Sequence, residues 1–536
     1  MFERSILCTG DYLHFPVKTG GRRTAVQLWY GAHLIYEFYF AITAEPDCDY
    51  YFFNVKEFAG QSLTIILPTP EDVTAAALDG IVCGGAPESE RAMYPNLYQE
   101  PNRPQYHFSS RRGWLNDPNG LVYADGLYHL YYQHNPFGND HGGVNICWGH
   151  AVSTDLLHWA ERQDAIPAWR REWMAASGSA LQDHDNKAGY GQGALIAALT
   201  GLGTYDPQTG GAYRSGGQFL AASTDGGDTY RLFSGIPAVG DENGEGWRDP
   251  RIFQYKDGFV MVVYETERGK NCASFYVSDD LRHWTRTCRA ADLYECPDFF
   301  PLVLEETGET YWVLYGANGK ARLGQFDGRV FKENGFFQFL DYGRALYAAQ
   351  TWNGQTDGRR IQIAWLTGGD PLYAAQPFSQ CMSLPCELSL QKTADGIRIC
   401  RRPVAETVSL RGGLAEEQAL AFAEQMALTL KPQSEYALSF TDIQKQLHLK
   451  IGAYEIQFDP AAQRLDFGDG KSCRTDGSAL HVRLFLDAGV AELFFDGCIS
   501  ASYVIPPEEQ TLSIQGSASV QLRRWPVHGI WPHMAE

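Results

Sequence analysis

The sequence predicts an all-β chain whose central part is a β-propeller. Most of the chain consists of short alternating or aromatic-rich runs, these runs are separated by Gly, Asp and Asn turns, and a strand–turn–strand pattern recurs. Helical periodicity is scarce, and its best candidate is a short stretch at residues 413–426.

The recurring pattern is a predicted hairpin. Residues 121–132 (LVYADGLYHLYY), 252–264 (IFQYKDGFVMVVY) and, more loosely, 302–315 (LVLEETGETYWVLY) each place turn residues between two hydrophobic runs. An Asp-Gly pair between alternating hydrophobic residues is a strong hairpin signal. We therefore expect three similar antiparallel strand pairs.

A second pattern follows the hairpins. Residues 153–159 (STDLLHW) resemble residues 278–284 (SDDLRHW), and residues 223–230 (STDGGDTY) are a weaker copy. The shared Asp155, Asp225 and Asp280 are 70 and 55 residues apart. Units of this length, each a four-stranded antiparallel sheet, build a β-propeller, and the repeated turn is expected to join the outer strands of each unit.

Composition excludes several classes of partner. The 536 residues suffice for two or three domains, and a formal net charge of −20 disfavours nucleic acid as a partner. No stretch of about 18 apolar residues occurs, so we expect no membrane partner. The N-terminal residues lack the apolar core of a signal peptide, which predicts a cytoplasmic protein; an extracellular location stays open in case a leader has been removed.

The twelve cysteines are scattered. They include no CxxC pair, and no His lies at zinc-ligand spacing from them. This pattern predicts reduced thiols, no metal site and no cofactor. The oligomeric state is left open, with a homodimer as one option.

An acidic motif precedes each predicted hairpin. Asp117 lies in WLNDPNG, Asp249 in WRDP and Glu295 in ECPD. Asp117 and Asp249 each stand eight residues before the Asp of the following hairpin turn. The strand at this position should be the innermost of its blade, and inner strands line the central channel of a propeller. We therefore expect the three carboxylates to meet at one mouth of that channel.

Three convergent carboxylates suit the cleavage of a glycosidic bond. Such cleavage needs one carboxylate that attacks the anomeric carbon or activates water, and one carboxyl group that protonates the leaving oxygen. Asp117, held in a Pro/Gly turn, is the candidate nucleophile. Glu295 is the candidate acid, because like-charged neighbours should raise its pKa. Asp249 is the candidate stabiliser of the transition state, and the adjacent Arg248 is expected to keep it ionised.

At the level of motifs, the chain resembles glycoside hydrolase family 32, the invertase, inulinase and levanase group. The similarity begins near residue 105, reaches the C-terminus, and includes nine motifs in order: QYHF (105–108), WLNDPNG (114–120), YYQHNP (131–136), WGHAVS (148–153), SGS (177–179), WRDP (247–250), ECPD (295–298), YAAQT (347–351) and MSLP (382–385). The resemblance implies a five-bladed propeller, a C-terminal β-sandwich and a retaining mechanism on β-linked fructofuranosyl units. It implies the same three roles for Asp117, Asp249 and Glu295.

The resemblance also implies substrate contacts. The candidates are Asn116, Gln133, His141, Ser177, Arg248 and Cys296. Three positions depart from the family pattern. Ala176 stands where an aromatic residue usually precedes Ser-Gly-Ser, His141 replaces a Trp, and Cys386 replaces the Arg after Ser-Leu-Pro. The first two remove apolar wall from the sugar pocket.

The predicted domains are a β-rich accessory domain at residues 1–100, the propeller at 101–390 and the sandwich at 391–536. The predicted function is the release of β-linked fructofuranosyl units from sucrose, fructo-oligosaccharides, inulin or levan. Three alternatives stay open: an inverting pentosidase type of propeller glycosidase, a fructosyltransferase, and a non-catalytic carbohydrate-binding propeller.

Overall fold

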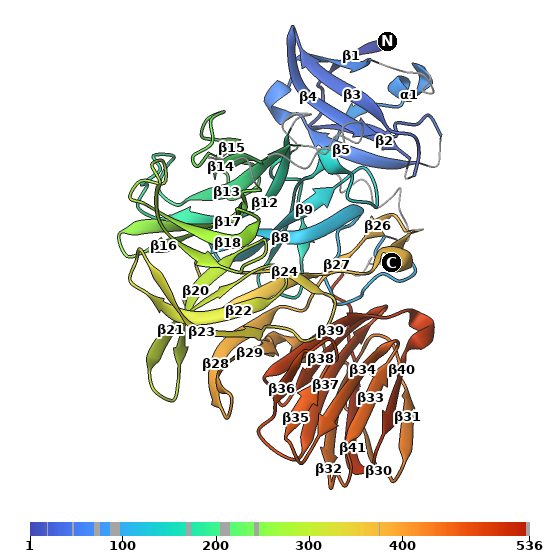
Figure 1. Cartoon of the computed structure of the whole chain (residues 1–536). Helices are drawn as coiled ribbons and strands as arrows, with labels where there is room; N and C mark the ends of the chain where they lie inside the picture. The colour runs from blue at the N-terminus through green and yellow to red at the C-terminus, as the bar shows by residue number, and fades with distance from the viewer. Residues whose placement is uncertain are drawn as a thin grey trace.

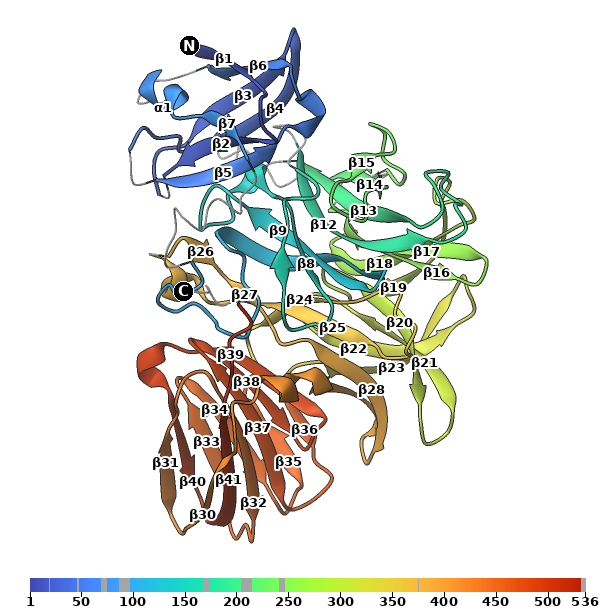
Figure 2. The same cartoon turned by 180° about the vertical axis from the view of Figure 1, so that it is seen from behind.

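The computed structural model contains three β-rich parts arranged along the chain (Figures 1 and 2). It describes residues 1–18, 20–45, 48–68, 75–85, 97–167, 173–203, 215–240, 246–374 and 376–531. The all-β prediction is confirmed, since the two α-helices, α1 (Ala75–Asp79) and α2 (Asp370–Tyr373), are single turns within these ranges. Within the same ranges, no helix has the length and apolar character needed to cross a membrane.

The N-terminal part is a two-sheet domain. One sheet has the order β1 (Phe2–Leu7), β6 (Ser62–Leu67), β3 (Thr24–Tyr30) and β4 (His33–Phe40), and the other has the order β5 (Asp49–Asn54), β2 (Tyr12–Val17) and β7 (Val82–Gly84). Burial alternates along β3 and β6, because side chains of a strand point to opposite faces. The inward faces form one aromatic-rich core.

The central part contains five four-stranded blades in the described ranges. The first is β8 (Gly113–Ala124), β9 (Leu127–Asn135), β10 (Cys147–Ser153) and β11 (Ala160–Glu161). The second is β12 (Trp173–Asp183), β13 (Ala194–Gly203), β14 (Ser215–Ser223) and β15 (Arg231–Leu232). The third is β16 (Arg248–Tyr255), β17 (Gly258–Glu267), β18 (Lys270–Ser278) and β19 (Thr285–Ala291).

The last two blades are joined by a single parallel bridge between β20 and β28. The fourth blade is β20 (Asp298–Leu304), β21 (Glu309–Tyr315), β22 (Lys320–Phe326) and β23 (Phe331–Phe339). The fifth is β24 (Leu346–Thr351), β25 (Ile361–Leu366), β28 (Cys386–Thr393) and β29 (Gly396–Pro403). Because β29 pairs along its length with β28, this blade continues past residue 390. The short β26 (Phe378–Ser379) and β27 (Cys381–Met382) pair with β8 and β25.

The predicted hairpins are the first two strands of the first, third and fourth blades. Asp125 and Gly126 form the first turn with positive φ, as an Asp-Gly turn requires. The second turn lies at Lys256 and Asp257, one residue earlier than its Asp-Gly pair suggests, because Tyr255 pairs with Gly258. First strands of neighbouring blades contact one another at β8 and β12, β12 and β16, β20 and β24, and β24 and β8, so these strands line the axis of the propeller.

The second repeated pattern joins the outer strands, as predicted. Asp155 accepts hydrogen bonds from the backbone N–H groups of Leu157 and His158 between β10 and β11, and Asp280 makes the equivalent bonds between β18 and β19. The carboxylate therefore replaces backbone acceptors that a tight turn cannot supply.

The C-terminal part is a sandwich of two six-stranded sheets. One sheet has the order β30 (Glu416–Phe422), β41 (Ala518–Pro526), β32 (Ser434–Thr441), β37 (Leu480–Asp487), β38 (Val490–Phe495) and β39 (Ile499–Val504). The other has the order β31 (Gln425–Thr429), β40 (Thr511–Gln515), β33 (Leu447–Ile451), β34 (Tyr454–Asp459), β35 (Arg464–Asp466) and β36 (Ser472–Arg474).

Two expectations, about residues 413–426 and about the cysteines, were wrong. Residues 413–426 form β30 and the start of β31 instead of a helix, because Leu420, Phe422 and Met426 pack at strand spacing against the sandwich core. The cysteines are not all thiols, since Cys400 on β29 forms a disulfide with Cys498 before β39. Tertiary pairing across 98 residues brings these two together, and sequence spacing carries no trace of it.

A buried polar network connects the propeller to the sandwich. His107 contacts Asp487 through Nδ1 (2.9 Å) and Glu492 through Nε2 (3.0 Å), and all three side chains are inaccessible to solvent. The two carboxylates raise the pKa of His107 from 6.5 to about 9 although burial opposes the charge. The network therefore contains a protonated imidazole between two carboxylates at neutral pH.

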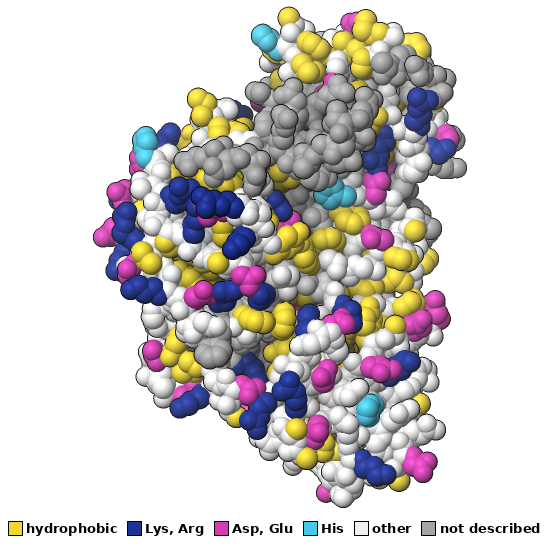
Figure 3. Space-filling model, viewed as in Figure 1, with side chains coloured by type: hydrophobic (Ala, Val, Ile, Leu, Met, Phe, Trp, Pro, Cys, Tyr) yellow, Lys and Arg dark blue, Asp and Glu magenta, His cyan; other side chains and the backbone are white. Residues whose placement is uncertain are grey.

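On the face seen in Figure 3, acidic and basic side chains are intermixed, without a large patch of either sign.

Candidate active site

Backbone irregularities lie at the same place in four inner strands. The pairing register shifts at Leu115/Pro118 in β8, Ala175/Gly178 in β12, Arg248/Arg251 in β16 and Tyr347/Gln350 in β24. A β-bulge re-aims the side chains next to it and is common beside active sites. Asp117, Ser177, Asp249 and Tyr347 all lie at these shifts or next to them.

Left-handed backbone conformations gather at the same point. Asp249 (φ 64°), Glu295 (φ 51°), Cys296 (φ 38°) and Ala348 (φ 49°) all have positive φ. This region disfavours residues with a Cβ and costs of the order of 1–3 kcal/mol each. The surrounding fold must therefore hold these residues in place, which is typical of a functional site.

Asp117 is partly buried and is held by three donors. Ser177 Oγ donates to its Oδ2 at 2.7 Å, Asn116 Nδ2 donates to its Oδ1 at 3.2 Å, and Cys296 Sγ lies 3.4 Å from Oδ2. Burial raises the pKa of Asp117, and the negative charge of Glu295 adds to this. The bonds from Ser177, Asn116 and Cys296 lower that pKa in part, because they stabilise the ionised carboxylate.

Asp249 lies on the other side of Cys296. Its Oδ2 accepts a hydrogen bond from the Cys296 backbone N–H at 3.0 Å and lies 3.5 Å from the thiol. Burial raises the pKa of Asp249 to about 7, with further increases from Glu295 and Asp117. Burial also keeps Cys296 protonated by raising its pKa. Cys296 therefore connects two carboxyl groups from different blades as a neutral donor.

Glu295 is held by a cation and a phenol. Arg248 Nη2 donates to its Oε1 at 2.6 Å, and the Tyr347 hydroxyl donates to Oε2. The Arg248 guanidinium lies over the Tyr264 ring, 4.4 Å from its centroid. The three predicted acids therefore form one cluster built from the first, third and fourth blades.

The expected role of Arg248 was wrong in one respect. Arg248 was expected to keep Asp249 ionised, but its guanidinium binds Glu295 directly and its Nε lies 3.8 Å from Asp249. The cation lowers the pKa of Asp249, yet desolvation outweighs it and leaves that pKa near 7. Sequence adjacency indicated one of the two partners, since Arg248 also binds Glu295, which lies 47 residues away along the chain.

The other predicted contacts separate into two groups. Asn116, Ser177, Arg248 and Cys296 bind the acids directly. Gln133 on β9 is buried, and its amide donates to the Ala175 carbonyl beside the bulge of β12 at 2.9 Å. It therefore supports the strand that carries Ser177. His141 lies in the loop after β9.

His141 forms part of an aromatic wall next to Asp117. Its ring meets Trp114 edge-on, with centroids 6.3 Å apart, and Trp114 meets Trp365 in the same way at 6.0 Å. Burial lowers the pKa of His141, which favours the neutral imidazole, and the charge of Asp140 opposes this shift. Trp114 Nε1 donates to Asn116 Oδ1 at 2.9 Å, which connects the wall to the cluster of acids.

Tyr347 and Trp365 contribute to the site but were not predicted as site residues. Tyr347 begins the YAAQT motif and lies on β24, the inner strand of the fifth blade. It was not predicted because this strand contains no acidic residue. Tyr347 is the last paired residue before the register shift of β24, and Asp117 lies within the shift of β8, so the YAAQT motif was the available sequence signal.

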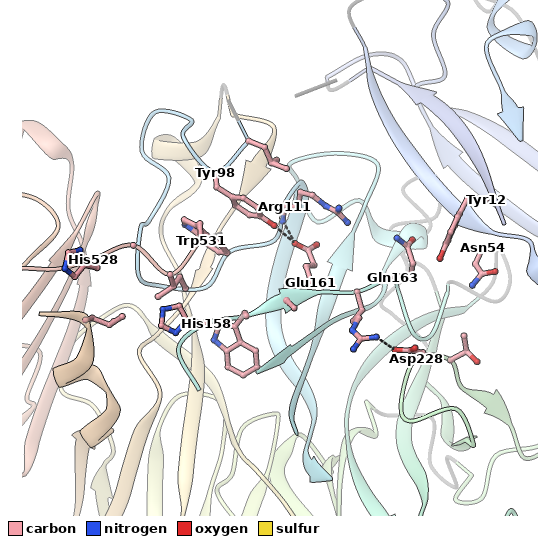
Figure 4. A pocket seen from close by; sticks show the side chains of 18 of the residues that line it. Tyr12, Asn54, Tyr98, Arg111, His158, Glu161, Gln163, Asp228, His528 and Trp531 are labelled. Atoms are coloured by element: carbon pink, nitrogen blue, oxygen red, sulfur yellow. Dashed lines mark hydrogen bonds and ion pairs between the residues drawn. The ribbon is translucent and has the colours of Figure 1, made fainter. Parts of the chain in front are cut away.

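A separate cavity of about 910 Å³ lies away from the acids. Figure 4 shows Tyr12 and Asn54 of the N-terminal domain, Glu161 at the outer edge of the first blade, and His528 and Trp531 near the C-terminus around it. Its polar groups largely bind one another, as in the Arg162–Asp228 ion pair at 3.2 Å. None of the three acids is among its described lining residues.

Among the residues that the structure describes, one group of side chains has ligand atoms close enough for a metal ion: His134, Cys147 and Asp164. His134 binds Asp164 through Nδ1 at 2.8 Å and the Arg112 carbonyl through Nε2 at 3.0 Å, and Cys147 donates to the His134 carbonyl at 3.2 Å. Both ring nitrogens of His134 thus have protein partners, and this group functions as a buried hydrogen-bond network.

Comparisons with known proteins agree with this geometry. The chain is 34% identical over 355 residues to a levanase from Bacillus subtilis, which covers 60% of this chain and 50% of that protein. It spans about half the length of the curated relatives it matches first. The crystal structure of an exo-inulinase from Aspergillus awamori has the same fold, with a TM-score of 0.70 at 23% identity over 81% of this chain and 100% of that chain. A β-fructofuranosidase from Bombyx mori gives a TM-score of 0.67 at 25% identity over 83% and 98% of the two chains.

The family model described as the glycosyl hydrolases family 32 N-terminal domain matches residues 107–403. This match includes all three acids and all five blades, and it ends with the last residue of β29. The chain therefore belongs to glycosyl hydrolase family 32.

Proposed function

We propose that this chain is a retaining glycoside hydrolase that releases β-linked fructofuranosyl units. Asp117 acts as the nucleophile, Glu295 as the acid/base and Asp249 as the stabiliser of the transition state. The observation that carries the proposal is the joining of three carboxyl groups from three blades through Cys296 and Arg248. Such a cluster supplies the nucleophile and the proton donor of glycoside hydrolysis from one place.

In the first step, Asp117 Oδ attacks the anomeric carbon and the bond to the leaving oxygen breaks. Glu295 gives its proton to that oxygen, so the aglycone leaves as a neutral alcohol. In the second step, Glu295 takes a proton from water, whose oxygen attacks the same carbon and releases Asp117. The bonds from Ser177 and Asn116 support the ionised form of Asp117 that the first step needs.

Asp249 suits binding to sugar hydroxyl groups. Its pKa near 7 allows it to accept a hydrogen bond when ionised and to donate one when protonated. The left-handed backbone at Asp249 and its bond from the Cys296 N–H fix the direction of the carboxyl group. A fixed group that binds the sugar more tightly as positive charge develops lowers the barrier.

The names of the relatives support the substrate class. They are a levanase, an exo-inulinase and a β-fructofuranosidase, so fructans and sucrose are the substrates to test. Purified protein is incubated with levan, inulin, short fructo-oligosaccharides and sucrose, and free fructose is measured. Fructose release from at least one of them is expected, and no release from any of the four would refute the proposal.

Stereochemistry tests the mechanism separately. With methanol as acceptor, a retaining enzyme yields the methyl β-fructofuranoside, and NMR identifies the anomer. The α-anomer as the initial product would rule out Asp117 as the nucleophile and would support the inverting alternative.

A further inference from the structure

We propose that the N-terminal domain is part of the substrate pocket, because it holds the loop at residues 136–145 that sets His141 against Trp114. This inference rests on the proposed function of the acid cluster. The domain lies outside the family match at residues 107–403. The N-terminal domain therefore affects the pocket wall beside Asp117 and, through it, the range of substrates that fit the pocket.

Phe137 anchors one end of the loop. It follows β9 of the first blade, yet its ring lies in the core of the N-terminal domain and is 6% exposed. It stacks on Phe40 with centroids 4.4 Å apart and planes at 8°, and it contacts Tyr51 at 4.3 Å and Phe38 at 5.4 Å. A propeller side chain therefore fills a space that the domain would otherwise leave empty.

Asn145 anchors the other end. It lies in the 3₁₀-helix η3 (Gly143–Asn145) and binds both backbone polar groups of Tyr39 on β4. The Tyr39 N–H donates to Asn145 Oδ1 at 3.0 Å, and Asn145 Nδ2 donates to the Tyr39 carbonyl at 2.6 Å. Because β4 is an edge strand, these backbone groups have no neighbouring strand to pair with. An ion pair between Arg23 of the N-terminal domain and Asp140 of the loop is a third connection.

The loop has little freedom between these anchors. Asn135 Nδ2 donates to the Asp140 carbonyl at 2.8 Å, and its Oδ1 accepts from the Phe137 N–H at 3.1 Å. Gly142 has φ 64°, and a Cβ there would lie 2.1 Å from the Asn135 amide nitrogen. The loop is therefore closed around Asn135, and its anchors decide where His141 points.

A continuous set of contacts leads from the loop to Asp117. His141 lies against Trp114, Trp114 donates to Asn116, and Asn116 donates to Asp117. Loss of either anchor should release the imidazole from the indole and widen the pocket, with a smaller effect on the nucleophile itself. We therefore expect substrate binding to change more than the rate of chemistry.

Two variants remove the anchors: Phe137→Ala and Asn145→Ala. The control is Ile65→Ala, which truncates a fully buried side chain of the same domain on β6, a strand that does not pair with β4. Phe137→Leu serves as the conservative rescue. For each folded variant, kcat and KM are measured on sucrose and on levan.

Both anchor variants are expected to raise KM about tenfold and to change the ratio of kcat/KM between sucrose and levan by about threefold or more. Ile65→Ala should leave KM and this ratio unchanged, and Phe137→Leu should recover most of the wild-type ratio. An equal fall in kcat on both substrates, with KM and the ratio unchanged, is what a smaller folded fraction produces. That result would overturn the proposal.

A second measurement separates this inference from the proposed function. Hydrogen–deuterium exchange is followed in the peptide that contains residues 114–117. Exchange there should be faster in the anchor variants than in Ile65→Ala, and equal exchange would overturn the inference. If wild-type protein releases no fructose while the exchange result holds, the proposed function fails and the coupling between domain and pocket stands.

Discussion

Replacing Tyr347 with Phe removes one hydroxyl group and tests the geometry of the acid/base. The Tyr347 hydroxyl donates to Glu295 Oε2, and Arg248 binds the opposite oxygen at 2.6 Å. A hydrogen bond to a charged group contributes about 1.5–3 kcal/mol. If the bond positions the carboxyl group in the transition state, its loss lowers kcat/KM about ten- to hundredfold, since about 1.4 kcal/mol corresponds to a factor of ten.

The assay compares Tyr347→Phe with Tyr311→Phe. Tyr311 also donates to a carboxylate, Glu309 Oε2 at 2.6 Å, but this pair is exposed on the fourth blade. We expect the control to keep wild-type kcat/KM on sucrose. An aryl fructoside, whose leaving group needs little protonation, should lose less activity than sucrose in Tyr347→Phe. Unchanged sucrose hydrolysis in folded Tyr347→Phe, or equal losses on both substrates, would refute the positioning role.

Three further predictions concern the acids and the domain interface. Asp117→Asn should lower kcat at least about a thousandfold with an unchanged circular dichroism spectrum, and substantial residual turnover would exclude Asp117 as nucleophile. Ser177→Ala removes a donor from Asp117, so the pKa of that carboxyl group should rise further and the acidic limb of the kcat/KM profile should move to higher pH; an unmoved limb would contradict this. The pKa of His107 is about 9, above its ordinary value of 6.5. The network with Asp487 and Glu492 therefore contributes about 3 kcal/mol to the free energy of unfolding at pH values below 6.5, and this contribution is lost as pH rises through about 9. Urea unfolding at about pH 6 and about pH 10 should show this loss in wild type but not in His107→Gln, and parallel curves would be the contrary result.

Repeats in the sequence were sufficient to predict the propeller and the meeting of the acids. Asp117 and Asp249 precede their hairpins at the same distance, and identical positions in a cyclic repeat converge on its axis. The stretch at 413–426 shows the limit of such reasoning. The spacing of its apolar residues is compatible with a helix or a strand. It forms two strands because these residues pack against the sandwich core.

Properties that depend on neighbours from other blades could not be predicted. The pKa of Asp249 near 7 arises mainly from burial, with contributions from Glu295 and Asp117, which lie 46 and 132 residues away along the chain, and these effects outweigh the adjacent arginine. Tyr347 reaches Glu295 across 52 residues, and no local pattern indicates that pair.

By itself, the sequence determined the repeat unit and the residues of the acid cluster, because hydrophobic periodicity and turn chemistry are local. Only the tertiary structure decided which group binds which carboxyl group, that Phe137 completes the core of another domain, and that Cys400 meets Cys498. Contacts of this kind depend on burial, distance and direction between distant segments, and those quantities exist only once the chain has folded.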